Sequence, residues 1–99
     1  MIRHIVMWKL KGEDAAAKSA SFTAVAEALG ALPPLIPEIH SFSIGQDLGE
    51  TDGNRDAVLI VDYKTTADLA TYQTHPDHVK AAAIVREHAS ERTTVDFEF

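Results

Sequence analysis

The first residues of the chain alternate in a way that predicts a β-strand with two apolar faces. From Ile2 to Lys11, one face of the strand carries every second residue: Ile2, His4, Val6, Trp8 and Leu10. The other face carries Ile5 and Met7 between charged residues. Because both faces are apolar in the middle, we expect helices over one face and a partner subunit over the other.

An amphipathic helix is expected after a turn at residues 12–14. Asp14 is a typical N-cap residue. Apolar residues then recur at steps of three and four, which is the spacing of one helix face: Phe22, Val25, Ala26, Leu29 and Leu32. Gly30 is expected just beyond the helix end, and Pro33 and Pro34 prevent continuation.

The middle of the chain predicts two strands joined by a hairpin. Residues 36–48 form the first extended segment, in which Phe42 and Ile44 are the alternating apolar pair and Pro37 disfavours regular pairing near the start. The polar connection over residues 49–56 contains Asp52-Gly53, a strong turn signal. Residues 57–63, AVLIVDY, are rich in β-branched and aromatic residues and predict the second strand.

The last third predicts two helices and a strand. Thr65 or Thr66 can cap a short helix that carries Leu69 and Tyr72 on one face. The sequence THPDH interrupts it, and Pro76 suits the first turn of a new helix. Helical spacing continues through His78, Ala82, Val85 and Ala89. Alternation over residues 92–99 predicts the closing strand.

The order of these elements predicts an α+β fold of the ferredoxin-like βαββαβ type, as a single domain over residues 1–99. Right-handed crossovers place the helices on one face of a four-stranded antiparallel sheet. The opposite face is then bare, and its apolar residues predict a homodimer that packs sheet to sheet. A chain of 99 residues without cysteine gains the burial it otherwise lacks through such an interface.

Composition narrows the choice of partners. The net charge of −6, with nine Lys and Arg and no cluster of five, argues against nucleic-acid binding and against a polybasic membrane patch. The zero cysteine count excludes disulfides and thiol chemistry. With no leader-like segment and no apolar run long enough for a membrane helix, we expect a cytoplasmic protein.

Three polar residues interrupt the inward-facing apolar pattern: His4, Tyr72 and His78. An imidazole can exchange protons near neutral pH, and a phenol can hydrogen-bond a developing enolate oxygen. Each residue alone fits ordinary core packing with a backbone partner. Their convergence from one strand and two helices favours a proton-transfer site.

Other candidate sites have less support. His75 and His78 are spaced like half a metal site, with only Asp77 and His4 as further ligands, so we expect no metal and assign His75 to the break at Pro76. No dinucleotide, P-loop, serine-hydrolase or zincin motif occurs, and no cofactor is expected.

We predict no role in a functional site for the remaining polar residues of interest. His40 and His88 have no partners in the pattern and are assigned to the surface. Two acidic residues lie on otherwise apolar strands, where each is expected to face solvent or to pair with Arg86 or Arg92: Asp62 and Asp96.

Several segments together resemble the stress-responsive dimeric α/β-barrel (Dabb) family. They are the opening IRHIVMWKLK, the strand AVLIVDY, the segment YQTHPDH and the terminal TVDFEF, with His4 and the Tyr-x-x-His-Pro-x-His motif as the most specific elements. The resemblance implies a ferredoxin-like protomer in a face-to-face homodimer. One branch contains a plant polyketide cyclase that performs an intramolecular aldol condensation without a cofactor.

In that branch the cavity lies between helices and sheet, and by position its catalytic residues match His78 and Tyr72, with His4 nearby. The resemblance implies a substrate pocket lined by Val6, Leu59, Val61 and Leu69. The cyclase has a further tyrosine on its first helix, where this chain has Ala26 and Glu27. The last helix is also rich in alanine here, so the cyclase substrate does not carry over.

The leading hypothesis is therefore a small-molecule-binding dimeric barrel, either a cofactor-independent cyclase of the aldol type or a related lyase or isomerase. His78 would transfer the proton, Tyr72 would orient it or the substrate oxygen, and His4 would supply a second polar contact. The alternatives are a non-catalytic stress-response dimer that is structural or ligand-binding, and a cofactor-free monooxygenase-like barrel.

Overall fold

The computed structural model describes residues 1–99 and confirms the predicted fold class. The elements follow the order β1 (Ile2–Leu10), α1 (Ala15–Gly30), β2 (Ser41–Gln46), β3 (Ala57–Tyr63), α2 (Thr66–Thr74), α3 (Pro76–His88) and β4 (Ala89–Glu98). The strands form one antiparallel sheet in the order β2-β3-β1-β4. No helix is long and apolar enough to cross a membrane.

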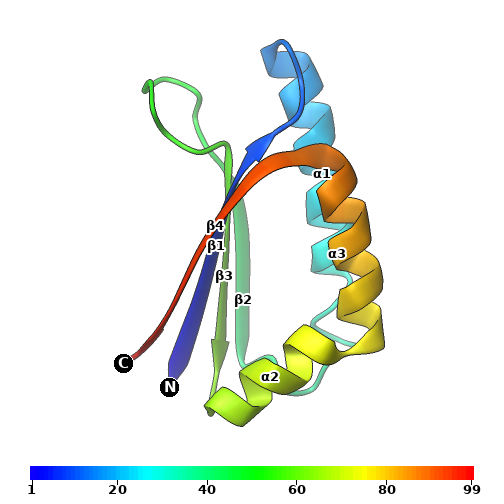
Figure 1. Ribbon diagram of the computed structural model, residues 1–99, viewed down its shortest axis with the longest axis vertical. Coiled ribbons are helices and arrows are strands. Elements are labelled where there is room, and N and C mark those ends of the chain that lie inside the picture. The colour runs from blue at the N-terminus through cyan, green and yellow to red at the C-terminus, as the bar shows by residue number, and fades with distance from the viewer.

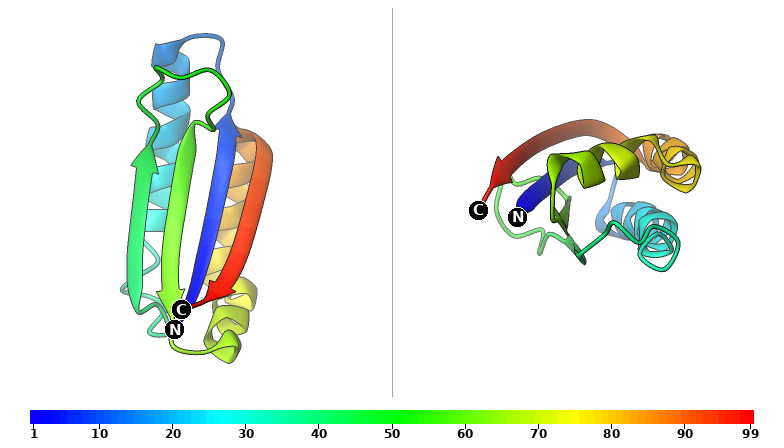
Figure 2. Two further views of the ribbon diagram at one scale, coloured as in Figure 1. Left: turned by 90° about the vertical axis from the view of Figure 1, so that its left-hand side faces the viewer. Right: turned by 90° about the horizontal axis from the view of Figure 1, so that it is seen from below.

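Two layers make up the molecule. Helices α1 and α3 lie side by side over one face of the sheet, and α2 runs across the end of the sheet where the chain termini meet (Figure 1). The other face carries no helix, as the view onto the sheet shows (Figure 2). The core lies between the sheet and the helices and includes the inward-facing residues of β1 apart from His4: Ile2, Val6, Trp8 and Leu10.

The helix boundaries follow from local chemistry. The Asp14 side chain accepts a hydrogen bond from the Ala17 amide at the start of α1, and Thr65 caps α2 in the same way through the Asp68 amide. Pro76 occupies the first turn of α3, where its missing N–H leaves no bond unmade. These caps were all predicted, and they place the break between α2 and α3 at His75.

The expected extended segment over residues 36–48 is wrong in its first half. Strand β2 covers only Ser41–Gln46, and residues 33–40 form successive turns, with the Ile36 amide bonded to the Leu32 carbonyl at 3.0 Å. The prolines limit strand pairing there, and the turns bury Ile36 completely. Gly30 is also not a left-handed residue beyond the helix: it ends α1, and Ala31 caps it with an ordinary φ of −77°.

The closing strand is longer than predicted. Strand β4 begins at Ala89, directly after α3, so Ala89 belongs to the strand and not to the helical stripe. Its register beside β1 sets Asp96 opposite His4 and Arg92 opposite Trp8. Since opposite residues in an antiparallel pair share a face, these β4 side chains lie on the side of the helices.

The uncovered face of the sheet is apolar, as predicted. Ile5 and Met7 of β1 lie opposite Ile60 and Val58 of β3, and on the other side opposite Val95 and Thr93 of β4. We call the apolar residues of this surface the outer face: Ile5, Met7, Val58, Ile60, Val95 and Phe97. Val95 and Phe97 are 51% and 41% exposed, so a large apolar patch faces solvent in the isolated chain.

Candidate functional site

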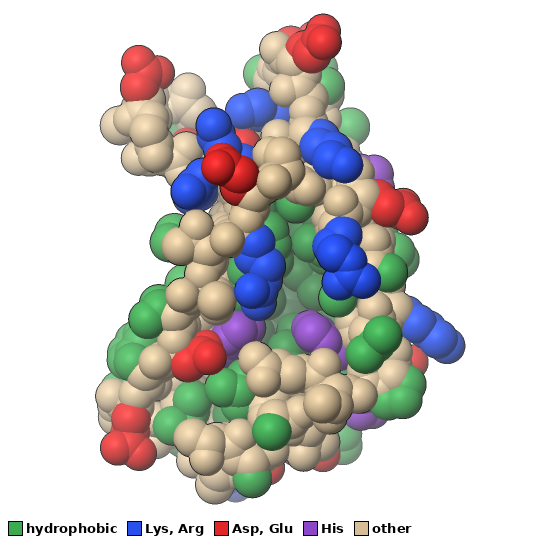
Figure 3. Space-filling model, viewed as in Figure 1, with side chains coloured by type: hydrophobic (Ala, Val, Ile, Leu, Met, Phe, Trp, Pro, Cys, Tyr) green, Lys and Arg blue, Asp and Glu red, His purple; other side chains and the backbone are tan.

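A cavity of about 460 Å³ lies between the sheet and α3. The residues that line it come from β1, β3, β4 and α2, as well as from α1 and α3. The space-filling view shows the hollow, with histidine side chains at one end and basic side chains at its opening (Figure 3). Apolar walls come from Val6, Trp8, Leu29, Leu59, Ala82 and Val85.

The three residues singled out from the sequence meet at one end of this cavity. His4 comes from β1, Tyr72 from α2 and His78 from α3, and all three line it. The Tyr72 ring centre lies 4.3 Å from that of His78 and 6.3 Å from that of His4. The cavity therefore has a polar end built from three separate elements, with mainly apolar walls beside it.

The orientation of His78 is fixed by its own segment of chain. Its Nδ1 lies 3.1 Å from the carbonyl oxygen of Gln73, at the end of α2. A carbonyl can only accept, so Nδ1 carries the proton and donates, and Nε2 keeps a free lone pair. Burial lowers the pKa of His78 below its ordinary value, with His4 and Arg92 adding to the shift. The imidazole is thus neutral at pH 7 and suited to accept a proton.

Tyr72 presents a buried hydroxyl whose one neighbour in the chain is the Tyr63 hydroxyl, without a hydrogen bond of regular geometry between them. The side chain is completely buried, and its hydroxyl has no hydrogen-bond partner of normal geometry. Burial raises the pKa of Tyr72 to about 12, so the phenol stays protonated and can donate. Tyr63 packs against it with ring centres 5.4 Å apart, and the Tyr63 hydroxyl is also without a partner. Tyr63, however, does not line the cavity.

His4 is paired, which the sequence pattern did not indicate. Its Nδ1 bonds to the Asp96 carboxylate across the β1–β4 pair. Asp96 is 40% exposed, which agrees with the expectation that it faces solvent, but its partner is His4 and not an arginine. A carboxylate that accepts from Nδ1–H fixes the ring of a histidine and leaves Nε2 for another contact. Asp96 thus acts as the residue that orients His4.

The expectation for Asp62 is wrong, because its partners lie on other strands. Arg3 donates to both carboxylate oxygens at 2.8 and 2.9 Å, and the Ser41 hydroxyl donates at 2.9 Å. These bonds hold the pKa of Asp62 below its usual range. Since Arg3 and Asp62 face each other on the helix-free side of the sheet, the group supports the sheet and lies away from the cavity.

The residues assigned to the pocket walls divide into two pairs. Val6 and Leu59 line the cavity. Val61 and Leu69 are buried in the core but do not line it. Val61 lies opposite His4 in the sheet but is completely buried, and Leu69 is buried on α2.

Arg86 and Arg92 line the opening of the cavity, a role that the sequence reasoning did not assign to them. Two signals could have indicated it. Arg86 follows His78 and Ala82 at steps of four residues, so the three share one helix face. Arg92 is an even number of residues from Asp96, so the two share one face of the strand. The missing information was the register of β4, which the sequence does not contain.

His75 is occupied by the helix break. Its Nδ1 accepts from the Asp77 amide at 3.1 Å and caps α3, which agrees with the predicted role at Pro76. His78 directs its own Nδ1 toward Gln73 instead. The two side chains do not converge, and no group of three or more potential metal ligands is found in the chain. His40 is exposed and His88 half-buried, and neither lines the cavity.

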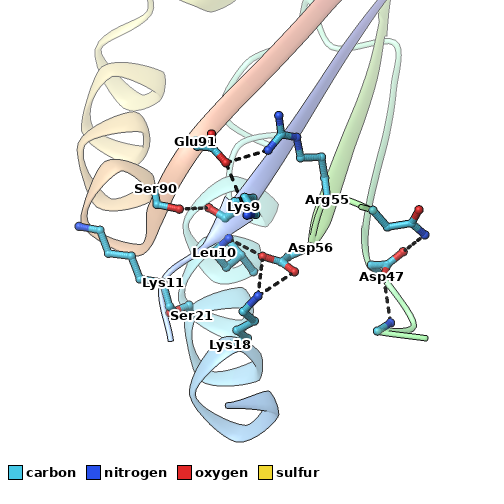
Figure 4. A network of polar contacts seen from close by, with 12 residues as sticks. Lys9, Leu10, Lys11, Lys18, Ser21, Asp47, Arg55, Asp56, Ser90 and Glu91 are labelled. Carbon is cyan, nitrogen blue, oxygen red and sulfur yellow. Dashed lines mark hydrogen bonds and ion pairs between the residues drawn. The ribbon is translucent and has the colours of Figure 1, made fainter. Parts of the chain in front are cut away.

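A separate polar network holds the opposite end of the sheet together (Figure 4). Asp56 accepts from the Leu10 amide at 2.8 Å and from Lys18 Nζ at 3.3 Å. Arg55 donates to Glu91 at 2.9 Å, and Lys9 lies 3.8 Å from the same carboxylate. The network therefore connects the loop before β3 to β1, α1 and β4. It also pairs the charge of Glu91, the acidic residue that lines the cavity.

Comparison with known proteins assigns the chain to a family. The family model of the stress responsive A/B barrel domain, Dabb, matches residues 2–99. The chain is a Dabb domain. A search of curated proteins finds no match.

Solved structures agree with this assignment. A protein of unknown function from Bacteroides fragilis is 31% identical, with a TM-score of 0.85 over 99% of this chain and 95% of that one. One from Thermobifida fusca is 33% identical, with a TM-score of 0.82 over 99% and 90%. Both are described as dimeric and ferredoxin-like.

A third structure is more distant in sequence. The hydroxynitrile lyase from Passiflora edulis is 17% identical, with a TM-score of 0.81 over 97% of this chain and 90% of that one. At this identity the likeness shows a shared fold only. The reaction of the Dabb domain described here must therefore be argued from its own residues.

Proposed function

We propose that this Dabb domain binds a small carbonyl compound in the cavity and catalyses aldol-type chemistry, the formation or cleavage of a carbon–carbon bond, by proton transfer alone. The observation that supports it is the pairing of a neutral imidazole with a free Nε2 and a buried phenol without a partner at one end of a cavity. A general base and a hydrogen-bond donor are the two groups that enolisation requires.

In the proposed reaction, His78 Nε2 removes a proton from the carbon next to a substrate carbonyl. The electron pair moves to the carbonyl oxygen, and the Tyr72 hydroxyl donates a hydrogen bond to the enolate that forms. The enolate carbon then attacks a second carbonyl, and the imidazolium returns its proton to the new alkoxide. The reverse sequence cleaves a β-hydroxy carbonyl compound. Atoms and charge balance in both directions without a cofactor.

His4 has a supporting role in this proposal. Its Asp96 partner fixes the ring, which leaves Nε2 for a second polar contact with the substrate. Apolar walls from Val6 and Leu59 hold the carbon skeleton and exclude water from the enolate. The specific substrate depends on the shape of these walls, which differ among proteins that share the fold.

The proposal is tested by following exchange of α-protons in D₂O by NMR with methyl ketones, keto acids and β-hydroxy ketones. Exchange above the buffer background reports proton removal even when the full substrate is unknown. General base catalysis contributes about 10²–10⁴ in rate, so His78→Gln should lose at least about 100-fold. His40→Gln is the matched control, because His40 is exposed and outside the cavity.

Wild-type rates in His78→Gln would refute the catalytic role of His78. If no compound exchanges faster than in buffer while the same compounds bind, the protein is a non-catalytic ligand-binding dimer. Consumption of dioxygen with an oxygenated product would instead favour the monooxygenase-like alternative.

The homodimer is also a proposal for this chain, and the exposed outer face supports it. Val95 and Phe97 extend the apolar surface of Ile5 and Ile60 into solvent, and two relatives above 30% identity are described as dimeric. Light scattering should give twice the protomer mass of 10.8 kDa. Val95→Glu should shift the protein toward monomer, whereas Val79→Glu should not, since Val79 is equally exposed but lies on α3.

A further inference from the structure

Two arginines at the opening of the cavity have no partner in the chain. Arg86 extends from α3 and Arg92 from β4, and both line the cavity. Neither takes part in any ion pair or side-chain hydrogen bond, although Arg3 and Arg55 both do. Arg92 also lies near enough to offset part of the rise that burial causes in the pKa of Tyr72 and to add to the lowering of the pKa of His78.

The acidic residues nearby do not neutralise this pair. Glu91 lines the same opening, but it accepts from Arg55 and lies within 3.8 Å of Lys9. Asp96 is engaged by His4. The opening is therefore a local positive region on a chain whose net charge is −6. Such a region within apolar walls attracts anions more strongly than the same charges on an open surface.

The positions of the two arginines relative to the proton-transfer residues are set by the elements that carry them. Arg86 lies two helical turns beyond His78, about 12 Å further along α3. Arg92 lies four residues before Asp96, about 13 Å back along β4. Since α3 and β4 run in opposite directions, both displacements point the same way (Figure 1). The backbones of both arginines are thus displaced toward the same side of His78 and Asp96, while the Arg92 charge still acts on Tyr72 and His78.

We infer that the cavity takes a carboxylate, with its anionic group between Arg86 and Arg92 and its reacting carbonyl at His78 and Tyr72. This inference rests on the proposed function, whose substrate class it narrows to keto acids. Two guanidinium groups match the planar oxygens of a carboxylate through paired hydrogen bonds. A keto acid with a flexible linker, such as 7-oxooctanoate, can place its two polar groups at these two positions at once.

The first test compares 7-oxooctanoate with 2-octanone by calorimetry. The two compounds have the same chain and ketone, and only the first carries a carboxylate. We expect the acid to bind at least about tenfold more tightly, which is the size of a partly exposed charge-assisted interaction. Arg86→Gln and Arg92→Gln should each remove most of this preference, and binding of 2-octanone should not change.

Lys80→Gln is the control for charge, because Lys80 is an exposed residue of α3 outside the cavity. It should leave the affinity for the acid unchanged. His78→Gln separates the two proposals: it should abolish proton exchange yet keep binding of the acid within about twofold, since the acid is held by the arginines. A variant that loses α-proton exchange but still binds 7-oxooctanoate therefore bears on the catalytic proposal and not on the role of the arginines.

Three results would overturn the inference. The first is equal affinity of the wild-type protein for 7-oxooctanoate and 2-octanone. The second is that the Arg86→Gln/Arg92→Gln double variant still binds 7-oxooctanoate more tightly than 2-octanone. The third is competition by adenosine 3′,5′-bisphosphate at lower concentration than by octanoate, which would assign the arginines to a phosphate group. Proton exchange with neutral ketones would remain in each case, so the proposed function would stand without the inference.

Discussion

Replacing Tyr72 with phenylalanine removes one oxygen from a place where burial leaves it without a partner. The side chain is 0% exposed, and the hydroxyl makes no hydrogen bond of regular geometry within the chain. Burying a hydroxyl without a hydrogen bond costs about 1–3 kcal/mol in proteins. Phenylalanine keeps the ring and its packing, so Tyr72→Phe should raise the free energy of unfolding by about 1 kcal/mol or more.

The same change should damage the proposed reaction. Removing one donor to a developing oxyanion typically lowers the rate by about 10²–10³. Tyr72→Phe is therefore expected to combine a more stable fold with at least about 100-fold slower α-proton exchange. Such opposite effects are characteristic of residues retained for function at some cost in stability.

Tyr63→Phe is the matched control. Tyr63 is also 0% exposed with an unpartnered hydroxyl, but it lies outside the cavity. It should stabilise the fold to a similar degree and, because its hydroxyl neighbours that of Tyr72 without lining the cavity, slow exchange far less than Tyr72→Phe does. A gain of 1 kcal/mol corresponds to about 4–8 °C in Tm for a domain of this size. Both variants should be measured by calorimetry at one protein concentration, because the Tm of a dimer depends on it.

Two results would refute this reasoning. If Tyr72→Phe lowers stability while Tyr63→Phe does not, the Tyr72 hydroxyl has a structural role. If Tyr72→Phe is stabilised but exchanges protons at the wild-type rate, the hydroxyl does not contact the enolate.

Three further predictions follow from burial, charge and backbone geometry. Because the pKa of His78 is lowered, the acid limb of the pH profile of kcat/KM should have its midpoint below 6.5, and this limb should disappear in His78→Gln. The free energy of unfolding should also fall as pH drops through 6.5, because there only the unfolded chain takes up the proton. Asp62→Asn should cost about 1 kcal/mol in urea unfolding at pH 7, a modest value because Arg3 is partly exposed. This difference should vanish in acid once pH falls through the lowered pKa of Asp62; a difference that persists there would exclude the ion pair as its cause. Gly12→Ala should lower Tm, since φ is +145° and a Cβ would lie 2.7 Å from the Lys18 amide nitrogen, whereas Gly30→Ala, with open space at its helix position, should raise it.

The parts of the fold that depend on local chemistry could be predicted from the sequence. Alternation identified β1, and β-branched and aromatic content identified β3. Asp14 and Pro76 marked two helix starts, and the structure chooses Thr65 over Thr66 as the cap of α2. The turns over residues 33–40 could not be predicted, because Ile36 and Ile39 read equally well as strand residues. Only the tertiary core shows that Ile36 is buried by a turn.

The candidate site also has a part that local sequence patterns predict and a part that depends on tertiary contacts. Parity along β1 and spacing along α3 correctly placed His4 and His78 on the inward side. The partner of His4 could not be identified, because it depends on the register between β1 and β4, which is a contact between the two ends of the chain. Alternation along β3 also places Val61 on the helix side of the sheet. Alternation does not indicate how far the cavity extends along the sheet, so it could not show that Val61 lies outside it.

The bond from His78 to the Gln73 carbonyl spans only five residues. Together with the cap at His75 and the proline at 76, it makes the reactive imidazole and the phenol of Tyr72 parts of one short piece of backbone. Ala82, Arg86 and Arg92 line the same cavity but lie outside that piece of backbone. In the proposed reaction, substitutions at the cavity opening could therefore change which compound is bound, while His78 and Tyr72 keep their relative geometry.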